Sequence, residues 1–275
     1  MTLATALFER IERCYDGIPR RDGARVEQVG PLDLFVREGV GWPYYARPRL
    51  GSATVTAFDV ERVRSRQRSL GVPEALEWVD EITPSLRLAA VGAGLLVTDA
   101  PLMVLDPAKL HDPGRLSAAS VHILDPSAET FPREYAVARA TASLGFGHGG
   151  TERGTEGTAQ RDAAVKPLDP EWAEWARGRA QSGLTAHAVA VIPGEGVLAT
   201  GSLQSAEGCS EVVGVATLPA ARKRGRGAAV SSALARHALA SGSELVFLSA
   251  ASEAVARVYA RIGFQRIGTA CIAAP

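Results

Sequence analysis

The residues best suited to chemistry lie between 211 and 264. A Val-rich stretch over 212–218 leads into the basic turn Arg222-Lys-Arg-Gly-Arg-Gly-Ala228, and apolar residues at helical spacing follow from Val230. Gly225 and Gly227 allow a ligand to approach the main chain, and the first amides of a helix carry partial positive charge. Arginine and lysine around the same point suit a diphosphate better than a carboxylate. The turn therefore predicts a phosphate-binding site, with an ordinary solvated turn as the alternative.

Two common nucleotide motifs do not describe this turn. A P-loop would continue with Gly-Lys-Ser/Thr, and a dinucleotide fingerprint would read Gly-x-Gly-x-x-Gly across it. Neither pattern is present between 222 and 228.

A second motif lies downstream of the turn. The pattern Arg222-x-x-Gly225-x-Gly227-Ala228, followed about thirty residues later by Tyr259-x-x-x-Gly263-Phe264, resembles the acetyl-CoA signature of the GNAT (GCN5-related) N-acetyltransferases. The resemblance covers the last 65 or so residues closely and is compatible with all of 119–275. It implies acetyl-CoA as cofactor, with CoA as product. The residues it assigns to cofactor binding are Val215, Ala216, Thr217, Arg222, Lys223, Arg224, Gly225, Arg226, Gly227, Ala228 and Ser252.

The resemblance also implies two catalytic side chains. Tyr259 would donate a proton to the CoA sulfur, and its position on the helix face of Val258 and Ile262 directs it toward the sheet. Glu211 would act as the base, directly or through water, with a solvated carboxylate as the alternative. The amide of Val215 or a neighbour would contact the thioester oxygen. Ser252 replaces the asparagine common in the family, and an N-cap explains it equally well. His187 and His237 lie within apolar patterns, which favours packed histidines.

The elements around these motifs predict an α/β (α+β) protein. The GNAT fold expected from the resemblance is a mixed, mostly antiparallel sheet flanked by helices. We expect an N-terminal degenerate GNAT-like lobe at 1–110, a linker at 111–118 and an N-acetyltransferase domain at 119–275. The basis for the first lobe is a topological echo, in which strand, helix, strand, helix and strand over 54–105 parallel the order at 212–273. The echo lacks the glycine turn, so that lobe should have no cofactor site.

Other stretches favour structural roles. Residues 54–58 predict a strand and residues 59–70 a charged helix, whose four arginines are interpreted as a solvated face because no aromatic residues alternate with them. The glycine-rich run 145–157 predicts a mobile surface loop over the acceptor side, with disorder as the alternative. Trp172 and Trp175 predict a packed or interface face, and exposed aromatic residues are compatible with a homodimer.

Composition limits the remaining function classes. The 275-residue chain has 30 basic and 30 acidic residues, so its formal net charge of zero gives no general attraction to nucleic acid or membranes. Its 3 cysteines have no metal-ligand or disulfide spacing, which predicts no metal and a reducing compartment. The sequence contains no run of apolar residues long enough to span a membrane and no export signal. We expect a cytoplasmic protein.

These observations predict an acetyl-CoA-dependent N-acetyltransferase that transfers an acetyl group directly to a primary amine of a small-molecule acceptor. Two alternatives stay open. One is a non-catalytic acyl-CoA-binding sensor or scaffold, and the other is acyl transfer to a thiol or hydroxyl acceptor.

Overall fold

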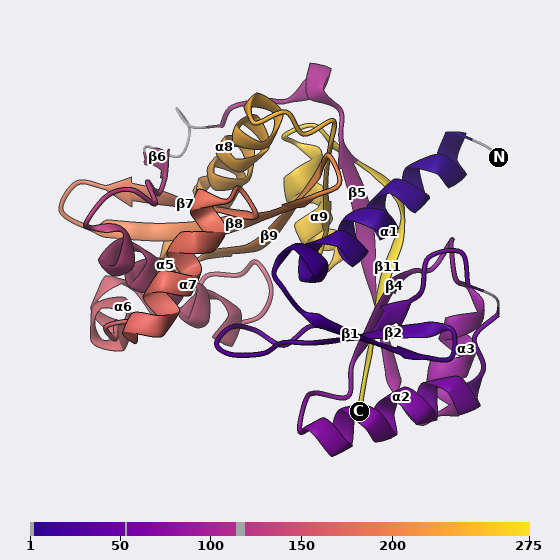
Figure 1. Ribbon diagram of the computed structural model, residues 1–275. Coiled ribbons are helices and arrows are strands. Elements are labelled where there is room, and N and C mark those ends of the chain that lie inside the picture. Colours follow the sequence, from indigo (N-terminus) through magenta and orange to yellow (C-terminus); the bar gives the residue numbers. More distant parts are fainter. Residues whose placement is uncertain (1–2, 53, 114–118) are drawn as a thin grey trace. The chain divides into compact units, whose positions relative to one another are not determined.

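The computed structural model describes residues 3–52, 54–113 and 119–275. It contains two compact units, Met1–Leu102 with Ile267–Pro275, and Met103–Arg266 (Figure 1). The last residues of the chain belong to the first unit because residues 270–273 pair antiparallel with strand β4 (Leu76–Val79). The observed division therefore differs from the domain limits 1–110 and 119–275 expected from sequence. Part of the expected linker, residues 114–118, lies outside the described residues.

The first unit combines a small antiparallel sheet with helices that alternate with strands. Its elements are α1 (Leu3–Arg21), β1 (Arg25–Val29), β2 (Leu32–Val36), β3 (Arg47–Pro48), α2 (Ala57–Leu70), β4, α3 (Ser85–Gly92), the start of β5 (Leu96–Leu105) and the end of β11 (Phe264–Ala274). Strands β1, β2 and β3 form one sheet, and β4, β11 and β5 are neighbours in another. Leu34, Trp78 and Leu86 are fully buried between these elements.

The strand expected at 54–58 is wrong, because α2 begins at Ala57. Thr56 and Asp59 form a capping box at the helix start. The Thr56 hydroxyl oxygen accepts from the Asp59 amide at 3.3 Å, and the Thr56 amide donates to the Asp59 carboxylate at 3.0 Å. The β-branched residues before Ala57 favour a strand by propensity, but the capping interaction starts a helix instead.

The echo expected from sequence therefore lacks its first strand. The order α2, β4, α3, β5 still parallels the order α8 (Arg226–Ala240), β10 (Leu245–Ser249), α9 (Glu253–Ala260), β11. A left-handed glycine precedes the last strand of each series, Gly94 with a φ of 79° and Gly263 with a φ of 107°.

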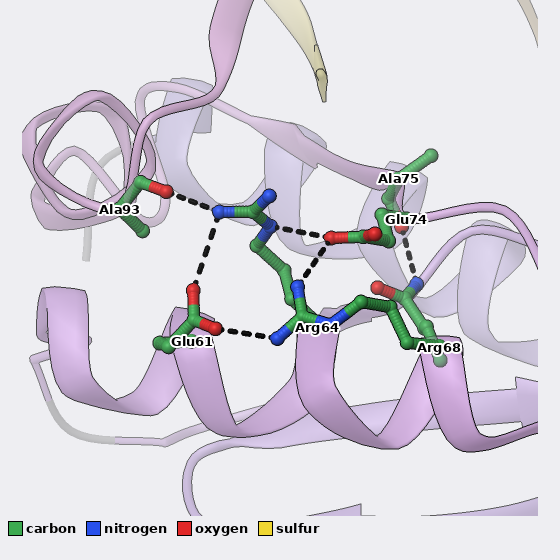
Figure 2. A network of polar contacts seen from close by, with 7 residues as sticks. Glu61, Arg64, Arg68, Glu74, Ala75 and Ala93 are labelled. Carbon is green, nitrogen blue, oxygen red and sulfur yellow. Dashed lines mark hydrogen bonds and ion pairs between the residues drawn. The ribbon is translucent and has the colours of Figure 1, made fainter.

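The arginine-rich face of α2 is occupied by partners within its own unit (Figure 2). Arg64 donates to the Glu74 carboxylate at 2.8 Å and also to the Ala93 carbonyl oxygen. Arg68 reaches Glu74 at 2.8 Å and Glu61 at 2.6 Å. These contacts tie α2 to the residues that precede β4 and follow α3, which gives the charged face a structural role.

The second unit is a mostly antiparallel sheet with helices on both faces (Figure 1). Its strand order is β5-β10-β9-β8-β7-β6, in which β9 and β10 are parallel and the pairs from β9 to β6 are antiparallel. The unit also contains β6 (Ser120–Ile123), α5 (Phe131–Gly147), α6 (Thr158–Ala164), α7 (Pro170–Gln181), β7 (Thr185–Ile192), β8 (Gly196–Ala206) and β9 (Cys209–Thr217). Helix α6 is not expected from the sequence.

Alternating residues of β7 face opposite layers of this unit. Ala188 packs in a core cluster with Leu234 of α8, and Val189 packs in a second cluster with Phe131 of α5. The expectation that His187 is packed is confirmed, since its ring lies 4.5 Å from that of Tyr135. Burial lowers the pKa of His187 to about 4, so this side chain is neutral at physiological pH.

Membrane-spanning helices and metal sites are absent from the described residues. No helix among them is long and apolar enough to cross a membrane. No three His, Cys, Asp or Glu side chains in this part of the chain are grouped as ligands for a metal ion.

Candidate active site

Strand β9 loses its pairing with β10, and its ladder with β8 is interrupted, close to the start of the expected cofactor-binding segment. It pairs in parallel with β10 up to Glu211. Its ladder with β8 then skips Gly214 and Val215 opposite the single residue Gly201, which is a β-bulge. Gly214 has a φ of 62°, a conformation that favours glycine. The bulge therefore falls at Gly214 and Val215, the position where the sequence places the contact to a thioester oxygen.

The turn after β9 has the geometry of an anion site at a helix start. Gly225 is the N-cap of α8 and has a φ of 71°. A Cβ on Gly227 would lie 3.3 Å from Thr217 Oγ1, so the first turn of α8 packs closely on the end of β9. The first amides of an α-helix have no partner within the helix and carry partial positive charge. These amides can bind phosphate oxygens beside β9.

Strand β9, this turn and helix α9 line one cleft of about 1140 Å³. The expected cofactor residues at 215–217 and 222–228 all line it, and so does Tyr259. Glu211 and Ser252 are not among the lining residues. Within the described residues, the lining contains no aspartate or glutamate but several basic residues: Arg222, Lys223, Arg224, Arg226, Arg257 and Arg261. This lining fits a long ligand with several negative charges, which CoA is.

Arg222, the first residue of the motif, donates hydrogen bonds from its guanidinium group to main-chain carbonyl oxygens. It is 9% exposed and donates to the carbonyls of Gly145 and His148 at 2.6 Å each and of Glu152 at 3.0 Å. All three carbonyls belong to the end of α5 and the glycine-rich run after it. Arg222 therefore fastens that segment to the turn, which is a different role from a phosphate ligand.

The other basic side chains of the turn also differ from one another. Arg226 is 3% exposed, donates to the Ala221 carbonyl oxygen at 3.0 Å, and has its pKa lowered by burial. Lys223 is paired with Glu152. Arg224 is exposed and has no ion-pair partner among the described residues. Of the expected phosphate-binding cations, Arg224 is thus the one whose charge is not already engaged in the described chain.

The glycine-rich run expected as a mobile loop begins inside α5. A Cβ on Gly145 would lie 2.8 Å from the Ala216 Cβ, so α5 touches β9 at a point where glycine is required. Further along, the Gly154 amide donates to the Pro219 carbonyl oxygen at 3.2 Å. Together with the Arg222 contacts, these bonds attach the run to the first residue of the cofactor turn and to the residues just before it.

Tyr259 lies on α9 with its side chain buried against Phe264, whose ring centroid is 6.1 Å away. Its hydroxyl hydrogen-bonds to Ser231 of α8, and the Ser231 hydroxyl donates to the Gly227 carbonyl oxygen at 2.9 Å. Burial raises the pKa of Tyr259 to about 12, with Ser231 acting in the opposite direction. The phenol therefore keeps its proton at neutral pH.

Glu211 and Ser252 lie next to the cleft elements without lining the cleft. Glu211 is 6% exposed and sits in β9 in register with Phe247 of β10. Ser252 is the N-cap of α9, and its hydroxyl oxygen accepts from the Val255 amide at 3.3 Å. The N-cap interpretation of Ser252 is confirmed, and its contact with a cofactor stays a prediction.

Sequence reasoning missed four residues of this region. Ser231 gives no local signal, because its partner Tyr259 is distant in sequence. Gly145 is indistinguishable from the other glycines of its run until its contact with β9 is known. Arg257 and Arg261 line the cleft from α9, and their spacing of four residues around Val258 was a usable signal.

Comparisons with known proteins identify the fold. Residues 194–273 match a family model described as FR47-like protein. A comparison with curated proteins finds no match. Among solved structures, a GCN5-related N-acetyltransferase from Kribbella flavida is 21% identical with a TM-score of 0.69, and the alignment covers 100% of this chain and 96% of that chain.

Two further solved structures have the same fold. A putative acetyltransferase of the GNAT family from Novosphingobium aromaticivorans is 18% identical, with 97% of this chain and 96% of that chain covered and a TM-score of 0.53. A tandem GNAT protein from the clavulanic acid biosynthesis pathway is 16% identical, with 89% and 78% covered and a TM-score of 0.54. The resemblance seen in the sequence is therefore confirmed: the chain has the GNAT fold, and its residues 194–273 carry the GNAT-related FR47-like pattern.

Proposed function

We propose that this protein is an acetyl-CoA-dependent N-acetyltransferase that acts on a primary amine of a small molecule. The observation that carries the proposal is the convergence of three features on one cleft. These are the bulged end of β9, the glycine turn at the start of α8, and the buried hydroxyl of Tyr259. A cofactor bound by β9 and the glycine turn would extend past the hydroxyl of Tyr259.

Bound acetyl-CoA would supply an acetyl group activated as a thioester. The amides at the start of α8 and the Arg224 guanidinium would hold its diphosphate. The amides of Gly214 and Val215 would bind along the pantetheine chain and polarise the thioester oxygen. Holding the two reactants together in this way accounts for much of the acceleration that an enzyme gives to a bimolecular reaction.

Tyr259 fits the role of proton donor to the departing sulfur. A buried phenol with its pKa raised to about 12 is protonated at neutral pH, so a proton is present when a thiolate needs one. The hydroxyl is oriented by Ser231, which itself is fixed on the main chain of α8.

The acceptor should carry little positive charge. Acyl transfer needs the amine in its deprotonated form, because only the neutral nitrogen has a free lone pair. Glu211 is buried beside the cleft, so its proposed action as a base would pass through a water molecule or follow a movement of β9. The proposal therefore predicts that Glu211→Gln slows transfer without weakening CoA binding.

Release of free CoA from acetyl-CoA, measured with pooled amines, thiols and alcohols, tests the function. We expect release that depends on an amine, and a decrease of about 10²–10⁴-fold in Tyr259→Phe. Tyr135→Phe is the matched control, because Tyr135 is equally buried at 8% exposed but packs on Phe131 away from the cleft. Release that depends on thiols or alcohols would favour the other acceptor class. CoA binding with no release under any condition would support a sensor.

A further inference from the structure

Two arginines at the C-terminal end of α9 belong to the lining of the cleft. Arg257 and Arg261 both line the cleft and are exposed. They are four residues apart, which places them on one helix face, with Cβ atoms about 5–6 Å apart. Glu253, the acidic residue of the same helix, is paired with Arg266 at 2.5 Å. Across the described ranges, neither Arg257 nor Arg261 forms an ion pair.

The turn itself cannot satisfy every charge of a CoA molecule. Arg222 and Arg226 donate to carbonyl oxygens, and Lys223 is paired with Glu152. The amides of α8 and Arg224 remain for the diphosphate. The nucleotide end of CoA carries a further phosphate, a monoester on the 3′ oxygen of its ribose. Such a group has up to two negative charges and strong acceptor oxygens, which a pair of guanidinium groups matches.

We propose that Arg257 and Arg261 form a subsite for the 3′-phosphate of CoA. The subsite rests on the proposed function, because it requires that the cleft binds CoA. Its consequence is selectivity: the protein distinguishes CoA from dephospho-CoA, which has the same diphosphate and pantetheine but no 3′-phosphate. The same arginines could instead bind an anionic group of the acceptor, and binding measured without any acceptor separates the two sources.

Isothermal titration calorimetry with CoA and dephospho-CoA, without acceptor, tests the subsite. For the wild type we expect CoA to bind about tenfold or more tightly than dephospho-CoA. In Arg257→Ala/Arg261→Ala, CoA affinity should fall by about tenfold to thirtyfold, while the affinity for dephospho-CoA should stay the same. Raising the salt concentration should reduce the wild-type preference, because exposed charges are screened.

Arg236→Ala is the matched control. Arg236 is also an exposed arginine on a helix of this unit, but it is paired with Asp112 at 2.7 Å and does not line the cleft. This variant should keep the full preference for CoA. Thermal unfolding of all variants checks that the fold is intact, which is expected because the side chains are exposed.

The possible failures are distinguishable. If the wild type binds both compounds equally, or if the double variant keeps the preference, the subsite is refuted while the proposed function stands. If the double substitution changes binding only when an acceptor with an anionic group is added, the two arginines bind the acceptor. The subsite for the 3′-phosphate of CoA is then refuted. If neither compound binds to the wild type, the proposed function fails and the subsite fails with it.

Discussion

Replacement of Arg222 tests how the motif arginine contributes to the site. In Arg222→Ala, the carbonyl oxygens of Gly145, His148 and Glu152 lose their shared donor, which lies 2.6 Å from the first two and 3.0 Å from the third. The contact between the end of α5 and the cofactor turn would then depend on packing and a few main-chain bonds. We expect a loss of stability and a loosening of residues 145–157.

The size of the effect follows from these contacts. A hydrogen bond from a charged donor contributes about 1.5–3 kcal/mol, and a buried carbonyl without a partner costs a further 1–3 kcal/mol or so. The bonds share one guanidinium and water can replace part of it, so they do not add. We expect the free energy of unfolding to fall by about 2–4 kcal/mol. Arg222→Lys should recover little, because an ammonium group cannot reach the carbonyls in the fork arrangement of a guanidinium.

Urea denaturation measures the loss of stability, and hydrogen exchange measures protection of the amides at 145–157. Arg224→Ala is the matched control, since Arg224 is exposed and lies two residues away in the same turn. It should leave stability and exchange unchanged while weakening CoA binding by about tenfold. An Arg222→Ala protein with wild-type stability and wild-type exchange would refute the structural role given to this arginine.

Three other outcomes are expected. Ser231→Ala should raise the pKa of Tyr259 further, because the interaction with Ser231 lowers it. The variant should reduce kcat with little change in KM for acetyl-CoA, as steady-state rates would show. Burial lowers the pKa of His187 to about 4 in the folded protein, so as the pH falls the unfolded protein binds this proton before the folded protein does. About 3 kcal/mol of folding stability, fully present above pH 6.5, should therefore be lost as the pH falls toward 4. His187→Asn should not show this loss. Gly201→Ala should cost about 1–3 kcal/mol in a denaturation experiment, because the new Cβ would lie 2.9 Å from a methyl group of Val230.

The fold of the second unit is largely readable from the sequence, because its signals are local. Apolar spacing after Val230 and the capping position of Ser252 locate α8 and α9, and glycines mark the turns between strands. The same locality explains the errors. A capping box at Thr56 competes with β propensity, and propensity alone gives the wrong element. The pairing of residues 270–273 with β4 joins segments far apart in the sequence, which no local pattern records.

For the candidate site, the sequence predicts which residues are close to the cleft but not the direction of their side chains. Motif spacing locates the residues that approach the cleft, and 215–217, 222–228 and Tyr259 do line it. Motif spacing does not say where a side chain points. Arg222 and Arg226 are basic residues of a phosphate motif, yet both are buried and donate to carbonyl oxygens. The direction of each side chain depends on packing partners such as Gly145, which come from other parts of the chain.

Calorimetric titration of CoA into the wild type, Gly225→Val and Gly242→Val tests the central claim most directly. Both glycines have positive φ, 71° and 89°, so each substitution strains the backbone next to one end of α8, but of the two only Gly225 lines the cleft. The account predicts that the wild type and Gly242→Val bind CoA and that Gly225→Val binds it at least about tenfold more weakly. Absence of binding heat in the wild type, or equal affinities in all three proteins, would contradict it.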